Sequence, residues 1–422
     1  MNTHQELKKI VLKNGTRLVF IPNAGAASVG ISVLVGTGSR FENSANNGIS
    51  HFLEHLVFKG TKNFRSQVLI SENIEGVGGV LNGYTSSQVT NYWAKVLPQH
   101  FKVATEVLTD LVISPLLRAK DLKSEKGVII EEIRMKDDNP MDETLELSEQ
   151  SLWGNSSLGF NVLGSEKTIR RLTAKNLVAY HARCYSPANI VVAVSGKFKE
   201  SEAVELLEGK FKTLPKSARL GRSKPIQTLH NIVIRKKETA QAHISFAFPT
   251  FPFSSRERYT ADVIASILGS GMSSRLFLNV RDKGLAYAIH CFNGYFADAG
   301  GFYTYAGVEK ERLPLAIKTI LLEFKKLARE EVGLSELTRA KEKIKGPFLF
   351  SLEDSVRAAE YYGYQEAAYG FAETPGEYLT NLATVNAADV KDLSLRLFNL
   401  SNLSFAAISP FERGRFENLL GF

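Results

Sequence analysis

The sequence predicts an α+β protein with two similar domains in tandem, each a mostly antiparallel sheet with helices packed on one face. Three observations support this fold class. The chain of 422 residues is too long for one ordinary hydrophobic core. Strand-like and helix-like segments follow one another in a similar order in both halves. A basic stretch bounded by Pro215 and Pro225 separates the halves, which places the domains at 1–215 and 229–422 with a linker at 216–228.

The first half begins with strand signals. Residues 8–12 and 16–21 flank Asn14-Gly15, a dipeptide typical of a tight hairpin turn, and residues 29–35 alternate well enough for a half-buried strand. Further strands are predicted at 80–85, 90–96 and 189–195. Helical periodicity predicts helices at 66–75, 99–113, 120–136, 145–152, 174–185 and 201–210.

The second half repeats this order of elements. The predicted correspondences are strand 242–248 with 29–35, strand 300–305 with 78–85, and helix 311–327 with 99–113. A helix at 256–268 takes the place of the helix that follows 29–35 in the first half. Sequence identity between the halves is weak, so the match depends on element order and on a Gly-Gly pair before a strand in each half.

Composition excludes several classes of protein. At 44% hydrophobic and 23% charged residues, the chain is typical of soluble globular proteins. The net charge is +8, but basic and acidic residues are interleaved and no nucleic-acid motif is present, so we expect no nucleic-acid partner. No apolar run approaches the roughly 18 residues that span a membrane, and the N-terminal stretch is polar, which favours a cytoplasmic location without a membrane partner. Cys184 and Cys291 lie far apart and are predicted to be free thiols.

One short segment, His51-Phe52-Leu53-Glu54-His55, carries chemically distinctive residues. On a helix, positions i, i+3 and i+4 share a face, so His51, Glu54 and His55 project together. An apolar stripe of helical period centres on the opposite face and suits a core: Ile49, Phe52, Leu53, Leu56 and Val57. The sequence therefore predicts a helix with one buried face and one face that presents two imidazoles and a carboxylate.

This spacing, HxxEH, is the inverted form of a metallopeptidase motif. Two neutral imidazoles can bind one Zn²⁺, and a third protein ligand leaves a fourth position for a water whose pKa the metal lowers to about 7. A neighbouring glutamate can then accept the proton of that water. The alternative interpretation, two structural histidines beside a solvated glutamate, is less favoured.

The third ligand is sought on the helix predicted at 120–136. Glu125 and Glu132 lie two turns apart on one face of that helix, and Glu131 precedes Glu132 directly. A carboxylate oxygen is a normal zinc ligand. Spacing alone leaves all three glutamates open as candidates.

Residues 51–61, HFLEHLVFKGT, resemble a signature segment of the M16 family of zinc peptidases, the pitrilysin or inverzincin group. The resemblance covers nearly the whole chain and is greatest to half-length members, namely the mitochondrial processing peptidase subunits and their bacterial relatives. In that family a glutamate ligand follows the second histidine after 76 residues in a V-I-x-x-E segment, and residues 128–132 meet this spacing. The resemblance therefore implies His51, His55 and Glu132 as ligands of one Zn²⁺ per chain, with Glu125 as a supporting acid of the catalytic site.

Two further segments are similar to family motifs. Asn82-Gly83-Tyr84-Thr85 resembles the N-A-x-T strand that binds substrate, with Gly83 in place of alanine. Arg281 and Tyr287 stand in a segment similar to the family's R-x-x-x-G-L-x-Y. The resemblance implies that the peptide backbone pairs with Asn82, Gly83, Tyr84 and Thr85 as an added strand. It also implies that Arg281 and Tyr287 stabilise the oxyanion of the tetrahedral intermediate.

The function implied is that of a zinc-dependent endopeptidase acting on peptides or unfolded polypeptide segments, with Glu54 as the general base. The alternative is a non-catalytic binding or assembly subunit of a heterodimeric M16-type complex, because some half-length members have lost the zinc motif or the Arg/Tyr pair. This chain keeps both sets of residues. That favours an active homodimer, with a heterodimer as the alternative.

Overall fold

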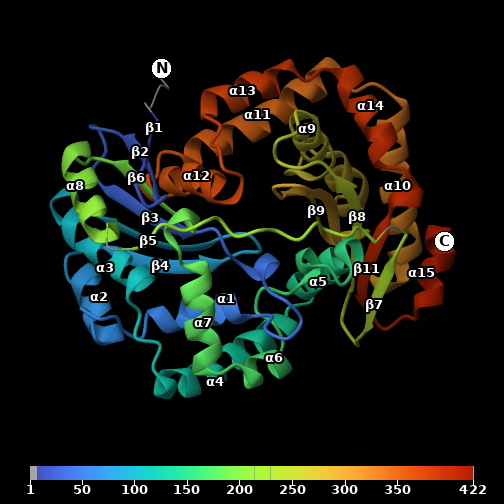
Figure 1. Cartoon of the computed structure of the whole chain (residues 1–422). Helices are drawn as coiled ribbons and strands as arrows, with labels where there is room; N and C mark the ends of the chain where they lie inside the picture. Colours follow the sequence, from blue (N-terminus) through green and yellow to red (C-terminus); the bar gives the residue numbers. More distant parts are fainter. Residues whose placement is uncertain (1–6, 213, 229, 422) are drawn as a thin grey trace. The chain divides into compact units, whose positions relative to one another are not determined.

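The computed structural model describes residues 7–212, 214–228 and 230–421. Residues 1–6, 213, 229 and 422, which the predicted domain bounds include, lie outside the described residues. The chain divides into two compact units (Figure 1). Unit 1 comprises the described residues up to Ile133 with Phe160–Ser223 and Leu349–Gly376, and unit 2 comprises the rest. Each unit thus contains a segment from the other half of the sequence, and the predicted linker 216–228 contains the change from unit 1 to unit 2.

Unit 1 is built on a six-stranded sheet with the order β1-β2-β6-β3-β5-β4. Its strands are β1 (Lys8–Val11), β2 (Arg17–Pro22), β3 (Val29–Val35), β4 (Val80–Thr85), β5 (Thr90–Val96) and β6 (Ile190–Gly196). β2 and β6 are parallel, and the other neighbours are antiparallel. This confirms the predicted α+β class with a mostly antiparallel sheet.

The main core of unit 1 lies between one face of this sheet and a layer of helices. These helices are α1 (Ile49–Val57), α2 (Gln67–Glu75), α3 (Phe101–Ile113), α4 (Ala119–Asp137), α6 (Glu166–Arg171), α7 (Ala174–Cys184) and α8 (Glu200–Phe211). Phe52 of α1, Val33 of β3 and Leu108 of α3 are fully buried in one cluster. The predicted apolar stripe of the motif helix therefore packs into the core, which holds the opposite face of α1 in place.

The predicted placement of helices on one face alone is wrong, because a helix from the other half of the sequence, α12 (Ser355–Ala368), covers the second face of this sheet. Leu34 and Val191 of the sheet pack there against Ala359 and Tyr362 of α12. The backbones approach closely at Gly30, where a Cβ atom would lie 2.5 Å from the backbone of Ser355. Glycine at this position is what allows the start of α12 to reach the sheet.

Gly30→Ala is therefore expected to lower the free energy of unfolding by about 1–3 kcal/mol, because the added methyl group overpacks the contact with α12. A matched control is Gly127→Ala in α4, where nothing lies within 4 Å of the new Cβ. That change should be neutral or stabilising by about 1 kcal/mol. Thermal unfolding of both variants measures the difference, and equal melting temperatures would contradict the assigned contact.

Unit 2 contains a five-stranded sheet with the order β7-β11-β8-β10-β9. Its strands are β7 (Ile232–Lys236), β8 (Ala242–Thr250), β9 (Ala286–Tyr295), β10 (Gly300–Val308) and β11 (Ser404–Ser409). Its helices are α5 (Pro140–Trp153), α9 (Glu257–Gly269), α10 (Leu313–Arg329), α11 (Leu334–Ser351), α13 (Pro375–Thr384), α14 (Ala387–Leu397) and α15 (Arg413–Leu420). α5, from the first half of the sequence, packs on β8 and β11, as α12 packs on β3 and β6 in unit 1.

The two sheets share a topology that corrects one predicted correspondence. β7 and β11 are parallel, as β2 and β6 are, so β8 corresponds to β3 and β10 to β5. The pairing of 300–305 with 78–85 is therefore wrong. The edge strand that corresponds to β4 is β9, a strand that local alternation did not indicate, because polar and apolar side chains are mixed on both of its faces.

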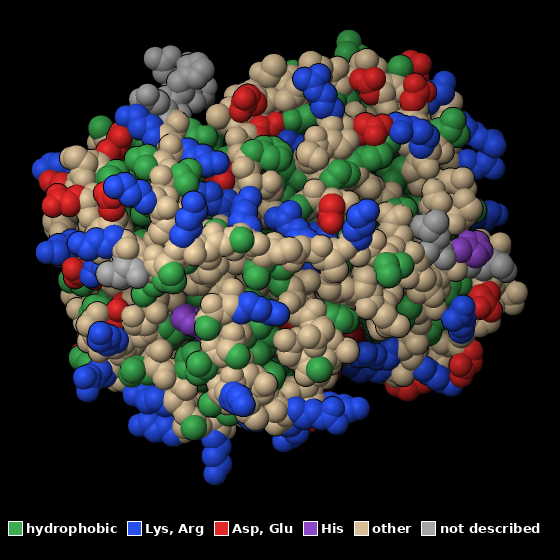
Figure 2. Space-filling model, viewed as in Figure 1, with side chains coloured by type: hydrophobic (Ala, Val, Ile, Leu, Met, Phe, Trp, Pro, Cys, Tyr) green, Lys and Arg blue, Asp and Glu red, His purple; other side chains and the backbone are tan. Residues whose placement is uncertain are grey.

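Three further expectations concern surface and chemistry. Among the described residues, no helix is long and apolar enough to cross a membrane. Cys184 and Cys291 are buried free thiols, as predicted. On the face shown in Figure 2, Lys and Arg side chains are scattered among acidic and uncharged ones.

Candidate metal centre

Helix α1 is anchored at its first turn by a buried carboxylate. Glu42 accepts hydrogen bonds from the backbone N–H groups of Gly48 and Ser50 at 2.7 and 2.8 Å. It thereby satisfies donors that a helix N-terminus leaves without intrahelical partners. With the apolar stripe in the core, this anchor fixes the rotation of α1 about its axis, and with it the direction of His51, Glu54 and His55.

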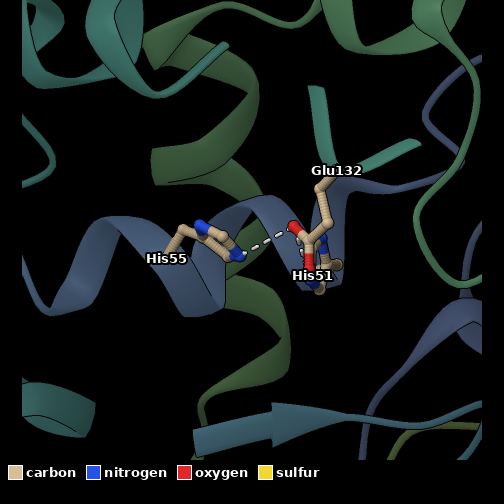
Figure 3. A group of neighbouring side chains, drawn as sticks. All are labelled: His51, His55 and Glu132. Atoms are coloured by element: carbon tan, nitrogen blue, oxygen red, sulfur yellow. Dashed lines mark ion pairs between the residues drawn. The ribbon is translucent and has the colours of Figure 1, made fainter. Parts of the chain in front are cut away.

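Three side chains converge beside α1 (Figure 3). Glu132 reaches from α4 toward the two imidazoles of α1, and the nearest ligand atoms of His51, His55 and Glu132 lie within 4.8 Å of one another. The Oε2 atom of Glu132 is 3.4 Å from Nε2 of His55 and 3.7 Å from Nε2 of His51. Among the residues that the structure describes, this is the one group of its kind.

These separations fit a tetrahedral zinc ion. Bonds of 2.0–2.1 Å at tetrahedral angles place neighbouring ligand atoms about 3.4 Å apart. The separations of 3.4 and 3.7 Å between Oε2 of Glu132 and the two imidazole nitrogens are close to the edges of such a tetrahedron. The donor set, two imidazole nitrogens and one carboxylate oxygen, is also one that zinc prefers in catalytic sites. Of the three glutamates left open by spacing, Glu132 is the one that joins the histidines, whereas Glu131 is exposed.

Glu125 contacts Nδ1 of His55, the ring nitrogen on the other side from the one that faces Glu132. Its Oε1 atom accepts a hydrogen bond from Nδ1 of His55 at 3.1 Å, and its Oε2 atom lies 2.8 Å from Nζ of Lys59. Burial opposes ionisation of Glu125, but the hydrogen bonds with His55 and Lys59 outweigh it and lower the pKa of the carboxyl. An ionised Glu125 holds the Nδ1 proton in place and leaves Nε2 of His55 available for a metal.

The pKa of the His55 imidazole is shifted strongly by its surroundings. Burial lowers the pKa of the imidazole, but its hydrogen bonds with Glu125 and Glu132 raise it to about 9 overall. Two carboxylates thus surround one imidazole and favour a cation between them. A zinc ion can take the place of that proton.

Glu54 occupies a different environment from the three grouped side chains. Only 8% of the residue is exposed, and its Oε2 atom accepts a 2.7 Å hydrogen bond from the hydroxyl of Thr85 on β4. Burial raises the pKa of the Glu54 carboxyl, an effect that the bond from Thr85 only partly offsets. A carboxylate with a raised pKa accepts a proton more readily than an ordinary surface carboxylate, as a general base requires.

The structure divides the four predicted substrate-binding residues between the two faces of β4. Thr85 faces α1 through its bond with Glu54, and a side chain at Gly83 would lie 3.1 Å from the ring of Phe58. Asn82 and Tyr84 alternate with them and face the side covered by α12. All four thus lie on an edge strand beside the candidate metal centre, in two pairs with different surroundings.

Arg281 and Tyr287 belong to unit 2. Arg281 ends the short helical turn Phe277–Arg281 and lies 4.8 Å from the centroid of the Phe277 ring. Tyr287, near the start of the edge strand β9, is 75% exposed. Both side chains are exposed, so neither belongs to the hydrophobic core of unit 2.

Two supporting residues were not predicted from the sequence. The sequence predicts for Thr85 only backbone pairing with substrate. Its side chain lies on the same face of β4 as Gly83, two residues earlier, and therefore points toward α1. The position of Lys59 could have been used to predict its role, because it follows His55 by four residues and so lies on the same side of the motif segment. Both contacts depend on how β4 and α4 pack against α1, which the sequence pattern does not specify.

Comparisons with known proteins extend over most of the chain. The family models described as "Insulinase (Peptidase family M16)" and "Peptidase M16 inactive domain" match residues 17–166 and 171–344. An uncharacterized zinc protease of Bacillus subtilis, YmxG, is 36% identical over 96% of this chain and 98% of its own length. An uncharacterized zinc protease of Streptomyces coelicolor is 32% identical over 91% and 86%. The crystal structure of a protease from Helicobacter pylori has the same fold, with a TM-score of 0.89 at 23% identity over 96% and 100% of the two chains.

Proposed function

Because this chain belongs to peptidase family M16 and its relatives are named zinc proteases, we propose that it is a zinc-dependent endopeptidase that hydrolyses peptides or unfolded polypeptide segments. The observation that carries the proposal is the convergence of His51, His55 and Glu132 directly beside a buried Glu54. One zinc ion per chain would be held by these three side chains. When bound, zinc acidifies a water molecule and polarises the scissile carbonyl.

Five side chains of the protein are proposed to carry out proton transfer, positioning and oxyanion stabilisation. Glu54 accepts the proton of the attacking water at its carboxylate and then donates it to the leaving amine. Thr85 holds that carboxylate in position, and Glu125 holds His55. Arg281 and Tyr287, both exposed on unit 2, are proposed to stabilise the oxyanion.

Substrate binding is proposed to use the edge of the sheet in unit 1. Among the described strands, β4 pairs with β5 alone, so its outer edge is open to an added peptide strand. Such pairing uses backbone groups that are available in a peptide or an unfolded segment and are already engaged in a folded substrate. We further propose that the active form is a homodimer and that the protein acts in the cytoplasm.

The proposal is tested by offering the enzyme one protein in folded and in irreversibly unfolded form. Cleavage of the unfolded form, abolished by a zinc chelator, is expected. Bound zinc without cleavage of any unfolded protein would favour the alternative of a non-catalytic assembly subunit.

Glu125→Gln is expected to weaken zinc binding by about 10–100-fold, because the neutral amide no longer fixes and polarises His55. Competition with a chromophoric chelator measures the affinity. Glu131→Gln on the same helix is the matched control, since Glu131 is exposed and lies outside the metal group. Equal zinc affinities for Glu125→Gln and wild type would remove the supporting role of Glu125.

Zinc affinity is also expected to depend on pH. In the metal-free protein the pKa of His55 is about 9, so below that pH a proton must leave the imidazole before zinc binds. Apparent affinity should therefore rise by about tenfold per pH unit between pH 7 and 9 and level off above. Chelator competition at several pH values tests this, and an affinity independent of pH over that interval would contradict it.

A further inference from the structure

The edge strand β4 separates two chemically different surroundings within unit 1. Gly83 and Thr85 face α1 and the base Glu54, whereas Asn82 and Tyr84 face the side covered by α12. An extended peptide paired with β4 would direct alternate side chains to these two sides. Side chains on the first side approach the metal centre, and those on the second approach α12.

A cavity of about 370 Å³ lies on the second side, between β4, β5 and the first turns of α12. Tyr84 and Trp93 provide aromatic walls, and the lining also includes four charged side chains: Lys95, Asp354, Arg357 and Glu360. Its mixed lining and its position at the sheet edge suit one long side chain with an apolar stem and a polar end.

One pair of these charges is fully engaged within the protein. Nζ of Lys95 lies 2.5 Å from Oδ2 of Asp354. The other oxygen of Asp354 accepts hydrogen bonds from the backbone N–H groups of Val356 and Arg357 and so caps α12. This pair ties the start of α12 to β5 and is not available to a ligand without breaking the cap.

Glu360 is engaged much less completely. Only 9% of the residue is exposed, and its Oε1 atom accepts one hydrogen bond from Asn91 at 3.0 Å. Its cationic neighbour, Arg357, is 3.4 Å from Oε2 with 71% of its side chain exposed. A solvent-exposed guanidinium at this separation stabilises a buried carboxylate weakly, and burial accordingly raises the pKa of Glu360. A closer and better shielded cation would satisfy this carboxylate better.

Building on the proposed peptidase function, we propose that this cavity is a side-chain subsite for a lysine or arginine of the substrate strand, with Glu360 as its carboxylate partner. The aliphatic stem of the basic residue would lie along Tyr84 and Trp93, whose rings also favour a cation. Arg357 competes for the same carboxylate and turns to solvent when substrate occupies the cavity. The subsite adds a sequence preference to recognition that otherwise depends on backbone pairing.

The test is digestion of a peptide library prepared from whole-cell protein, with the cleaved bonds identified by mass spectrometry. A substrate strand paired with β4 in a fixed register directs one particular side chain into the cavity. Wild-type enzyme should therefore favour Lys or Arg over Gln or Met by about tenfold at one position relative to the cleaved bond. Glu360→Gln should reduce this ratio to near one. Arg357→Gln should raise it severalfold, because the competing cation is removed.

The outcomes separate the subsite from the peptidase proposal. Cleavage by wild type with the same basic-residue ratio in Glu360→Gln and Arg357→Gln would overturn the subsite while leaving the peptidase intact. Absence of any cleavage by zinc-loaded wild type would overturn both. Zinc content and melting temperature show whether Glu360→Gln folds. If it does not, Arg357→Gln, which alters an exposed side chain, decides the matter, and an unchanged ratio in that variant rejects the subsite.

Discussion

Glu54→Gln is expected to retain zinc at the wild-type level and to lose about 10²–10⁴-fold in kcat. The amide keeps the size and the hydrogen-bond acceptor of the carboxylate, so the contact with Thr85 at 2.7 Å can persist. It cannot accept the proton of the attacking water or return one to the leaving amine. Because Glu54 is outside the group that would hold the metal, zinc binding should be unaffected.

The measurement is kcat on a fluorogenic peptide together with zinc content for wild type, Glu54→Gln and Glu54→Asp. The aspartate variant keeps a carboxylate at a greater distance and should recover part of the lost rate. In wild type, the rate should fall with acidity through a pKa above the ordinary value for glutamate, because burial raises the pKa of Glu54 and protonation removes the base. Normal turnover by Glu54→Gln would eliminate Glu54 as the base.

His55→Ala is expected to abolish stable zinc binding and, with it, detectable peptide cleavage. The change removes one of three protein ligands and also leaves Glu125 without its hydrogen bond from the imidazole. Two remaining ligands, His51 and Glu132, are fewer than catalytic zinc sites use. Equilibrium dialysis with zinc, followed by a peptide assay on the same samples, measures both losses.

His100→Ala serves as the matched control, since His100 lies before α3 and outside the metal group. It should bind zinc and cleave peptides as wild type does. Full zinc binding by His55→Ala would show that the metal is held elsewhere, and the assignment of the centre to α1 and α4 would fail.

Local patterns predicted the helix that carries the candidate site but not the surroundings of that helix. The HxxEH spacing places His51, Glu54 and His55 on one helical face, because the apolar residues of α1 leave only that face outside the core. Spacing could not distinguish Glu125 from Glu132, since both share a face of α4. In the structure Glu132 approaches Nε2 of both His51 and His55, whereas Glu125 contacts Nδ1 of His55 alone, and this difference depends on how α4 packs across α1.

Local sequence patterns could not predict that a segment from each half of the sequence packs on the sheet of the other half. No helix was predicted at Ser355–Ala368, and nothing in its pattern of residues indicates that it covers the sheet of the other half of the sequence. The pattern of α5 likewise does not indicate that it packs on the sheet of unit 2. The predicted correspondence of strand 300–305 with 78–85 was wrong for a related reason. The position of a strand in its sheet is set by hydrogen bonding between distant segments, which local patterns do not specify.

The most direct test of the central claim is zinc content and peptide turnover on one purified sample, before and after metal removal and after zinc is restored. The account predicts about one zinc per chain, turnover that disappears with the metal, and recovery of both when zinc returns. Turnover that survives complete removal of the metal, or a folded protein that never takes up zinc, would contradict it.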